Sequence, residues 1–398
     1  MTDKGNHYLI IFPLWLLVFA ASSQVMIIAP LLPQIGLEIQ TSEEVLGYLI
    51  TVYATALGIC AIMIGPLSDK IGRRKILLLG SSAMTVFLLA HSGANSFISL
   101  LLIRTATGFS AGILSGAAVS YVGDYFPYEK RGWASGWIMS GIAMGQILGI
   151  PMGTFLAEDF GFKFPFILFG IVMGITFLLV LFFVPQPKVK LQKKKITFKN
   201  SIIKYSSLLK KTDIRAVALS YLLMFLSLSI YIIYLPLWLD QKFNISSSDF
   251  GLLFCVGGFI NAITGPRAGK LSDQIGRKKM IISSCIGLAI IMFLTTYLIV
   301  DFWVAYIIFP MVMLLIAIRI SPFQALSSEL VNSVNRGSLM SLLVSFGNIG
   351  SGIAGILAGY LYISAGYFSN TIFGGVTIIL TAFLVWKYVP EPEFKPID

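Results

Sequence analysis

The chain is poor in charged residues and contains almost no histidine. Asp, Glu, Lys and Arg make up 12% of its 398 residues and only two residues are histidine, whereas roughly a quarter of an average soluble protein is charged. Hydrophobic residues account for 57% of the chain. These proportions exclude an ordinary soluble globular domain and a disordered chain, and they indicate a protein that lies within the lipid bilayer.

Cysteine is also scarce, and nothing in the sequence resembles a metal site. Cys60, Cys255 and Cys285 all lie in apolar runs and none forms a CxxC pair, so we expect them to be small core residues. His7 and His91 are not spaced as metal ligands. No buried nucleophile, acid pair or nucleotide domain is apparent either. The sequence therefore predicts no metal, no cofactor and no enzymatic activity.

Long hydrophobic runs dominate what is present, and a bilayer span needs about 20 of these residues. Hydropathy predicts twelve spans, at about 8–32, 45–66, 76–94, 97–123, 132–156, 164–184, 214–239, 249–268, 279–299, 302–327, 338–363 and 369–389. A polar break separates the first six from the last six. We therefore expect an all-α membrane protein with one six-helix bundle at 1–185, a basic linker at 186–213 and a second bundle at 214–398.

The distribution of the 29 lysines and arginines predicts the orientation of these spans. If the N-terminus is cytoplasmic, only Lys163 and Lys242 fall on the outer side, and only Arg104 and Arg319 fall inside spans. Nearly all the others lie in cytoplasmic loops, ten of them between 188 and 215. Both termini are therefore expected in the cytoplasm of a multi-pass plasma or inner membrane protein. The basic run faces anionic lipid there, which removes the reason to expect nucleic-acid binding.

An internal repeat relates the two halves. Gly-Pro-Leu-Ser-Asp-Lys-Ile-Gly-Arg-Arg-Lys at 65–75 follows the second span, and Gly-Lys-Leu-Ser-Asp-Gln-Ile-Gly-Arg-Lys-Lys at 269–279 follows the eighth. Arg131-Gly132 and Asp124 recur as Arg336-Gly337 and Glu329. The sequence therefore predicts two homologous halves of the same orientation.

The segment 65–75 resembles the signature loop between the second and third spans of the major facilitator superfamily. Twelve spans, a basic central loop and the repeated signature extend the resemblance over the whole chain. Arg104 and Gly108 resemble the R-x-x-Q-G element of proton-coupled facilitators, with Thr107 in place of Gln. The fifth span, with Pro151, resembles the glycine-proline motif of the drug:proton antiporter branch and is most similar to bacterial sugar- and drug-efflux permeases.

The resemblance implies that the repeated signature forms a latch that closes the cytoplasmic side. Asp69 would face the positive N-terminus of the eleventh span, and Asp273 that of the fifth. Ion pairs of Arg73 and Arg131 with Asp124 or Asp69 would hold the same state. The alternative is that these cations only fix the topology. The expected latch residues are Gly65, Asp69, Gly72, Arg73, Arg131, Asp273 and Arg277.

The fifth span carries glycines every four residues, which places them on one helix face. Small residues let two helices approach closely, and Pro151 favours a kink. The resemblance implies that this face meets the eighth span, whereas ordinary helix packing is the alternative. The expected packing residues are Gly145, Gly149, Pro151 and Gly153.

Arg104 and Arg319 lie inside spans, where a charge is costly and is by default a functional candidate. No acid lies in the middle of a span. Proton coupling is therefore assigned to Arg104 and Asp124, with Asp249 or the substrate itself as alternatives. Arg319 either binds an anionic group or pairs with a backbone carbonyl or Glu329. The expected substrate-binding residues are Arg319, Gln24, Tyr53, Asn261, Gln146 and Asn348, although each can instead join helices through a hydrogen bond.

These observations predict a secondary transporter that moves a small molecule by alternating access. The resemblance implies efflux of drugs or sugar-like compounds in exchange for protons, by a monomer. The alternative is a proton-independent facilitator or exchanger of an organic anion or a sugar. Two buried arginines without a buried acid favour a neutral or anionic substrate over a lipophilic cation.

Overall fold

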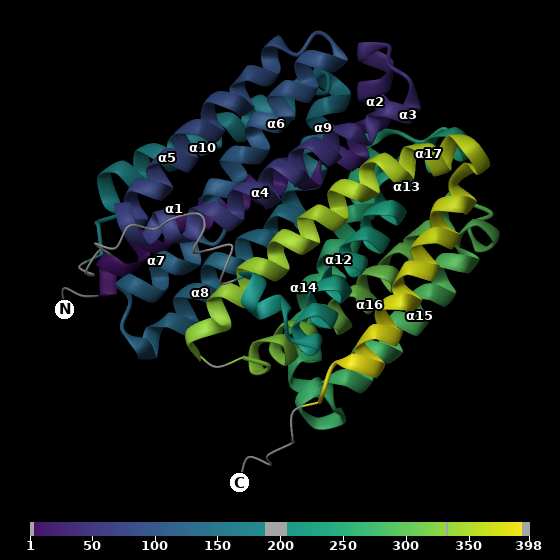
Figure 1. Ribbon diagram of the computed structural model, residues 1–398. Coiled ribbons are helices and arrows are strands. Elements are labelled where there is room, and N and C mark those ends of the chain that lie inside the picture. Colours follow the sequence, from purple (N-terminus) through teal and green to yellow (C-terminus); the bar gives the residue numbers. More distant parts are fainter. Residues whose placement is uncertain (1–3, 188–204, 332, 392–398) are drawn as a thin grey trace. The chain divides into compact units, whose positions relative to one another are not determined.

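A computed structural model of the protein describes residues 4–187, 205–331 and 333–391, and these residues contain helices but no strand (Figure 1). Much of the expected basic linker lies outside these ranges. The first part comprises α1 Lys4–Met26, α2 Ile28–Ile39, α3 Glu43–Leu46, α4 Tyr48–Ile71, α5 Arg73–Leu89, the 3₁₀ turn η1 Ala90–Gly93, α6 Phe97–Leu114, α7 Ala117–Tyr125, α8 Tyr128–Met144, the π-helical turn η2 Gly145–Gly149, α9 Ile150–Phe160 and α10 Lys163–Phe183. The second comprises α12 Thr212–Ile233, α13 Leu235–Phe243, α14 Ser247–Ile275, α15 Arg277–Leu298, α16 Phe302–Glu329 and α17 Ser333–Tyr388.

The helices are long and apolar enough to cross a membrane twelve times. Eleven helical segments of the described chain meet that length and composition, and the last of them, Arg336–Tyr388, has 53 residues. Its backbone leaves the helical conformation at Ala365 and Gly366, so it contains two spans. Large apolar side chains such as Phe182 and Trp303 are exposed, as lipid-facing positions require. The expected twelve-span, all-helical architecture is confirmed.

The helices cluster into two compact units. One contains Met1–Ser201 and Ile245–Cys255, and the other contains Ile202–Asn244 and Val256–Asp398. The first turns of α14 thus cluster with the first unit. The boundaries expected from hydropathy, at 185 and 214, stay a prediction.

In the first unit α1 packs on α8, η2 and α10, while α6 packs on α4 and α5 (Figure 1). Glycines allow α6 to approach α4 closely. A Cβ on Gly112 would come within 2.5 Å of the Cβ of Cys60 and 2.8 Å of the carbonyl oxygen of Leu57. Because such an approach is open only to glycine, these positions fix α6 against α4 and hold Arg104 of α6 in the bundle interior.

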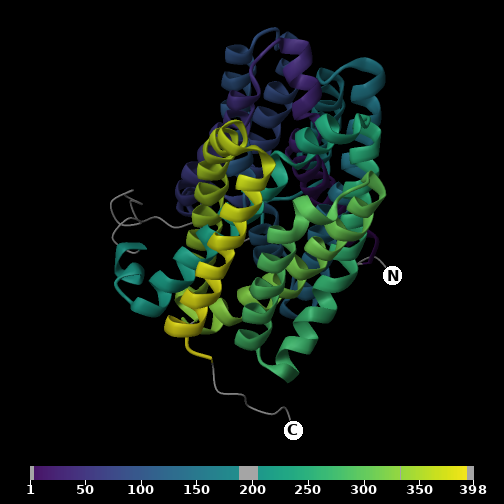
Figure 2. The same cartoon turned by 90° about the vertical axis from the view of Figure 1, so that its right-hand side faces the viewer.

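In the second unit the two arms of α17 pack on α12 and α15, and Figure 2 shows them folded back beside each other. The reversal is at Gly366, whose φ of +69° favours glycine. Hydrogen bonds tie the second arm to its neighbours. The hydroxyl of Tyr367 donates to the carbonyl of Tyr231 at 2.6 Å, and that of Ser227 donates to the carbonyl of Gly374 at 2.7 Å.

Several spans are interrupted, which hydropathy did not predict. The first span divides at Ile27, the fourth at Gly116 with φ of +71°, and the seventh at Tyr234. In the fifth span the π-helical turn Gly145–Gly149 precedes Pro151, which then occupies the first turn of α9. A proline is tolerated there because the amide hydrogens of a first turn lack helical partners. Pro151 thus follows the wider turn Gly145–Gly149, and the kink expected at Pro151 stays a prediction.

Candidate functional site

The first signature loop is tied to its own bundle by an ion pair. Nε of Arg73 lies 2.7 Å from Oδ2 of Asp124, and its Nη1 donates to the hydroxyl of Ser68 at 2.8 Å. Both charged side chains keep some exposure, 16% and 27%, so salt and water screen the pair and its contribution is modest. The pair nevertheless fixes the start of α5 against the end of α7.

The second signature loop repeats this arrangement. Nη1 of Arg277 lies 2.5 Å from Oε1 of Glu329, and Nη2 lies 3.0 Å from Oδ1 of Asp273. Arg277 corresponds to Arg73 in the sequence repeat, and Glu329 corresponds to Asp124. The repeat seen in the sequence is therefore also a repeat of side-chain contacts. Glu329 is engaged by Arg277, so the suggestion that it pairs with Arg319 finds no support.

Backbone geometry at the two loops matches as well. Gly72 and Gly276 have φ values of +100° and +105°, and each ends a helix by donating its N–H to the serine carbonyl four residues earlier. Arg131 donates from Nε to the carbonyl of Phe126 at 3.0 Å. The surroundings of the other two expected latch residues, Gly65 and Asp69, fall outside the described part of the structure.

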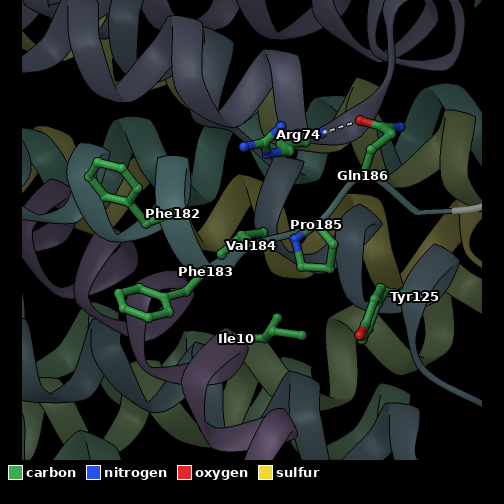
Figure 3. A pocket seen from close by; sticks show the side chains of 8 residues that line it. All are labelled: Ile10, Arg74, Tyr125, Phe182, Phe183, Val184, Pro185 and Gln186. Carbon is green, nitrogen blue, oxygen red and sulfur yellow. Dashed lines mark hydrogen bonds between the residues drawn. The ribbon is translucent and has the colours of Figure 1, made fainter.

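A pocket of about 500 Å³ adjoins the first loop (Figure 3). The amide oxygen of Gln186 accepts the backbone N–H of Arg74 at 3.2 Å, and Nη2 of Arg74 donates to the carbonyl of Leu181 at 2.6 Å. The pocket lies where α5 begins and α10 ends. Its lining comprises Ile10, Arg74, Tyr125, Phe182, Phe183, Val184, Pro185 and Gln186.

Gln186 has a counterpart in the second unit that the sequence reasoning missed. Oε1 of Glu391 accepts the backbone N–H of Lys278 at 3.1 Å. The sequence Val-Pro-Gln-Pro at 184–187 recurs as Val-Pro-Glu-Pro at 389–392. This further match between the two halves is the sequence signal that could have identified Gln186 and Glu391 as counterparts. In each half, a side chain that follows the last span of that half caps the N-terminus of its third span.

Three of the expected functional residues meet inside the first unit. Nη1 of Arg104 donates to Oε1 of Gln24 at 3.2 Å, and Nε2 of Gln24 donates to the hydroxyl of Tyr53 at 2.9 Å. The guanidinium carbon lies 4.4 Å from the centre of the Tyr53 ring. Arg104 and Gln24 are fully buried, and Tyr53 is nearly so. We call Arg104, Gln24 and Tyr53 the arginine cluster.

The arginine cluster contains no acid to neutralise its cation. Within the described residues, Nε and Nη2 of Arg104 are buried without a hydrogen-bond partner. Asp124, which was expected to work with Arg104 in coupling, is instead paired with Arg73 at the end of α7. The structure therefore does not bring the two expected coupling residues together.

Arg319 occupies a comparable environment in the second unit. It is 1% exposed, it lies beside the thiol of Cys285, and its Nε and Nη1 are buried without a partner among the described residues. Ser284, next to Cys285, donates its hydroxyl to the carbonyl of Leu315 at 2.6 Å. Each unit thus encloses one arginine that no carboxylate neutralises.

The remaining expected substrate contacts do not join these arginines in a described contact. Asn348 donates from Nδ2 to the carbonyl of Val344 at 2.8 Å, one turn back in its own helix. Gln146 lies in the π-helical turn and Asn261 in the middle of α14, and both are partly exposed. Their roles in substrate binding stay predictions.

The glycines of the fifth span face α1 of the same unit. A Cβ on Gly149 would collide with the side chain of Ser23, and one on Gly145 would come within 3.1 Å of the Cβ of Ser22. A Cβ on Gly153 would come within 2.8 Å of Ile27. The eighth span, which was the expected partner, touches a different side of α9: a Cβ on Gly251 would lie 3.1 Å from the Cα of Pro151.

A metal centre is not part of this arrangement. Among residues 4–187, 205–331 and 333–391, no three His, Cys, Asp or Glu side chains are grouped so that they would hold a metal ion. The buried polar groups are instead two arginines, one histidine, amides and hydroxyls inside helical bundles. Such groups recognise a solute or carry a proton within a membrane.

Comparison with known proteins agrees with this architecture. A sequence model of the Major Facilitator Superfamily matches residues 14–217 and again 217–397. The multidrug resistance protein MdtG of Proteus mirabilis (strain HI4320) is 27% identical over 310 residues, which is 75% of each chain. An uncharacterised MFS-type transporter, YceJ of Bacillus subtilis (strain 168), is 25% identical over 391 residues, 93% of this chain and 95% of that protein.

Solved structures show the same fold. A D-xylose-proton symporter superimposes with a TM-score of 0.78 at 18% identity, over 98% of this chain and 99% of the other. The human organic anion transporter MFSD10 (TETRAN) superimposes with a TM-score of 0.70 at 16% identity, over 97% and 100%. The family match spans nearly the whole chain, so the protein is a multi-pass membrane transporter and not an enzyme, and it belongs to the major facilitator superfamily.

Proposed function

We propose that this transporter exports a drug-like or sugar-like compound from the cell in exchange for protons. The observation that carries the proposal is the similarity to MdtG, a multidrug resistance protein, over three quarters of both chains. The R-x-x-T-G element at Arg104 and the glycine-rich fifth span support the same branch of the superfamily. The substrate site is proposed near the middle of the membrane, as in other transporters built from two repeats.

A second candidate is a proton-independent facilitator or exchanger of an organic anion or a sugar. Arg104 and Arg319 favour it, because each buried guanidinium has two nitrogens without a hydrogen-bond partner and no ion pair with an acid among the described residues. A planar carboxylate or a phosphate is the natural partner of such donors. A lipophilic cation is the substrate class that these residues favour least.

Uptake into proteoliposomes separates the two candidates. The full chain would be reconstituted and offered ciprofloxacin, a labelled hexose or labelled p-aminobenzoate, under an imposed pH gradient, with and without a protonophore. Proton exchange requires gradient-driven accumulation of at least one probe that the protonophore abolishes. Accumulation or exchange that is indifferent to the protonophore would contradict it and favour the second candidate.

We also propose that the repeated signature acts as the latch, with the side chain of Asp69 at its centre. The matched ion pairs of Arg73 and Arg277 support an equivalent role for the two loops. Asp69→Asn is expected to slow transport of the probe that the wild type carries, with expression unchanged. Lys75→Gln, in the same loop, is the control and should transport normally. Normal transport by Asp69→Asn would contradict the latch.

A further inference from the structure

His91 is a buried base that the proposed site does not yet use. It lies in η1, where α5 ends, and its side chain is fully buried. Exposed residues follow at once, since Ser92 and Gly93 are both open to solvent. The imidazole is therefore enclosed by the bundle but lies one residue from its surface.

The hydrogen bonds of the ring define its tautomer. Nδ1 lies 2.9 Å from the carbonyl oxygen of Phe87 and 3.1 Å from that of Leu88. Carbonyl oxygens only accept, so Nδ1 carries the hydrogen in the neutral ring. Nε2 is then the basic lone pair, and it is buried without a partner among the described residues. Most buried polar atoms are hydrogen-bonded, so a base left bare in the bundle interior needs an explanation.

His91 is connected to the arginine cluster through one aromatic ring. Its imidazole stacks on Phe166 with ring centres 4.3 Å apart and an interplanar angle of 15°. The guanidinium carbon of Arg104 lies 5.7 Å from the centre of the same ring. A charge on His91 would therefore act on Arg104 across Phe166.

Among the described residues, the helices packed against η1 carry cations but no acid. The elements packed against η1 are α5, α6 and α10. Their ionisable groups are Arg104, Lys163, whose amine donates to the Oδ1 of Asn95 at 2.5 Å, and the three basic residues at the opposite end of α5. A protonated imidazole would therefore add a second positive charge to an interior that already holds Arg104, and the two like charges would repel each other.

We propose that His91 accepts the coupling proton at Nε2 and passes its effect to the substrate site through Arg104. The inference rests on the proposed proton exchange and names its residue. A proton needs no cavity, which suits a group that is fully enclosed. A carboxylate is the common proton carrier in such transporters, and this chain has none in the middle of a span. His91, at the end of α5, would serve as the proton carrier instead.

Repulsion between the two cations would couple proton binding at His91 to the position of Arg104. A proton on His91 opposes Arg104 in its present position and weakens its hold on Gln24. Conversely, Arg104 in this position disfavours the proton. Because such coupling between two sites is reciprocal, proton binding and the present arrangement of the arginine cluster exclude each other. A solute that binds Arg104 in its present position would therefore exclude the proton, which is what proton-for-solute exchange requires.

The titration of His91 can be measured without a known substrate. The chain has two histidines, so histidine-selective ¹⁵N labelling of the full protein in nanodiscs gives two rings, and His7→Gln assigns the one that remains. We expect the Nδ1–H tautomer in the neutral ring of His91, and uptake of a proton at Nε2 as the pH falls from about 8 to about 5, the range in which histidine serves as a switch. Arg104→Gln should shift that titration. A ring that stays neutral over this range in both proteins would overturn the proposal.

Transport supplies the second arm. His91→Phe keeps the stacking on Phe166 but cannot take a proton. With the probe that the wild type carries, this variant should lose accumulation driven by a pH gradient, down to the level of protein-free vesicles, and should keep exchange of probe for probe. His7→Gln is the matched control and should accumulate normally. Gradient-driven accumulation by His91→Phe would overturn the role of His91 alone, whereas a wild type indifferent to a protonophore would refute proton exchange itself.

Discussion

At the scale of single residues, the arginine cluster shows how one cation is kept inside an apolar bundle. Arg104 has one hydrogen bond, to Gln24, and lies over the ring of Tyr53. A desolvated cation–π contact is worth about 2 kcal/mol, and a hydrogen bond to a charged group is worth about 1.5–3 kcal/mol. Both contacts offset part of the cost of burying the guanidinium, and both leave two of its nitrogens free.

Two substitutions of Tyr53 separate these contributions. Tyr53→Phe keeps the ring beneath Arg104 and removes only the acceptor of Gln24, so it should lower the free energy of unfolding by about 1 kcal/mol. Tyr53→Leu also removes the aromatic ring and should cost about 2 kcal/mol more. Thermal unfolding of the purified protein in one detergent measures both. Equal losses would show that the ring does not stabilise Arg104.

The sequence predicted the members of this cluster but not their meeting. Arg104 stood out because a charge inside a span is rare, and Gln24 and Tyr53 because they are polar at a similar depth. Their contact depends on which helices are neighbours and on how each is rotated about its axis. Hydropathy carries neither, which is also why His91, one of two histidines without a motif, attracted no role.

At the scale of elements, the glycine face of the fifth span sets the distance between two helices. Gly149 is packed against Ser23 of α1, whereas a Cβ on Gly136 of α8 would meet nothing within 4 Å. Gly149→Ala should therefore destabilise the protein by about 1–3 kcal/mol, as overpacking does. Gly136→Ala is the control and should be neutral or stabilising, because alanine is the better helix former. Thermal unfolding of the two variants provides the test.

A compensating change can confirm the partner helix. Ser23→Gly removes both atoms that a Cβ at position 149 would approach most closely. Added to Gly149→Ala, it should restore most of the lost stability, which is the non-additivity expected of residues in contact. Additive losses in the double variant would mean that Gly149 does not pack on α1.

The caps of the third and ninth spans allow a second comparison between elements. Gln186 and Glu391 accept equivalent backbone N–H groups at the beginnings of α5 and α15. A negative charge is favourable at a helix N-terminus by about 0.3–1 kcal/mol. Gln186→Glu should therefore stabilise the protein slightly, whereas Gln186→Leu should destabilise it by about 1 kcal/mol through the lost cap. Thermal unfolding at low salt measures the difference, and a stabilising Gln186→Leu would contradict this account.

The repeat was the most informative sequence signal at this scale. Its offset of 204–205 residues matched Arg73 with Arg277 and Asp124 with Glu329, and in the structure each arginine forms an ion pair with the acid of its own half. The same offset links Gln186 with Glu391, which went unnoticed because a four-residue echo rich in proline looks like an ordinary helix end. By contrast, the breaks at Ile27 and Tyr234 have no marker in the hydropathy, because both sides of each break are apolar.

At the scale of the whole molecule, composition and periodicity were sufficient for the architecture. Twelve apolar runs became twelve spans, because a backbone inside a bilayer must satisfy its own hydrogen bonds and a helix does so locally. The division into units depends on long-range contacts instead. That is why residues 245–255, which include the beginning of α14, cluster with helices of the first half, the last of which ends at Phe183.

Orientation in the membrane stays a prediction from the distribution of charge, and it decides which side would supply the proton proposed for His91. Lys75 and Asn95 are exposed near opposite ends of the third span. In a full-length variant whose three cysteines are replaced by alanine, a membrane-impermeant maleimide applied to whole cells should label Asn95→Cys and leave Lys75→Cys unlabelled. Opening the membrane should expose Lys75→Cys as well. Labelling of Lys75→Cys alone in intact cells would show that the topology is the reverse of the predicted one. Since His91 lies at the Asn95 end of the span, its proton would then enter from the cytoplasm.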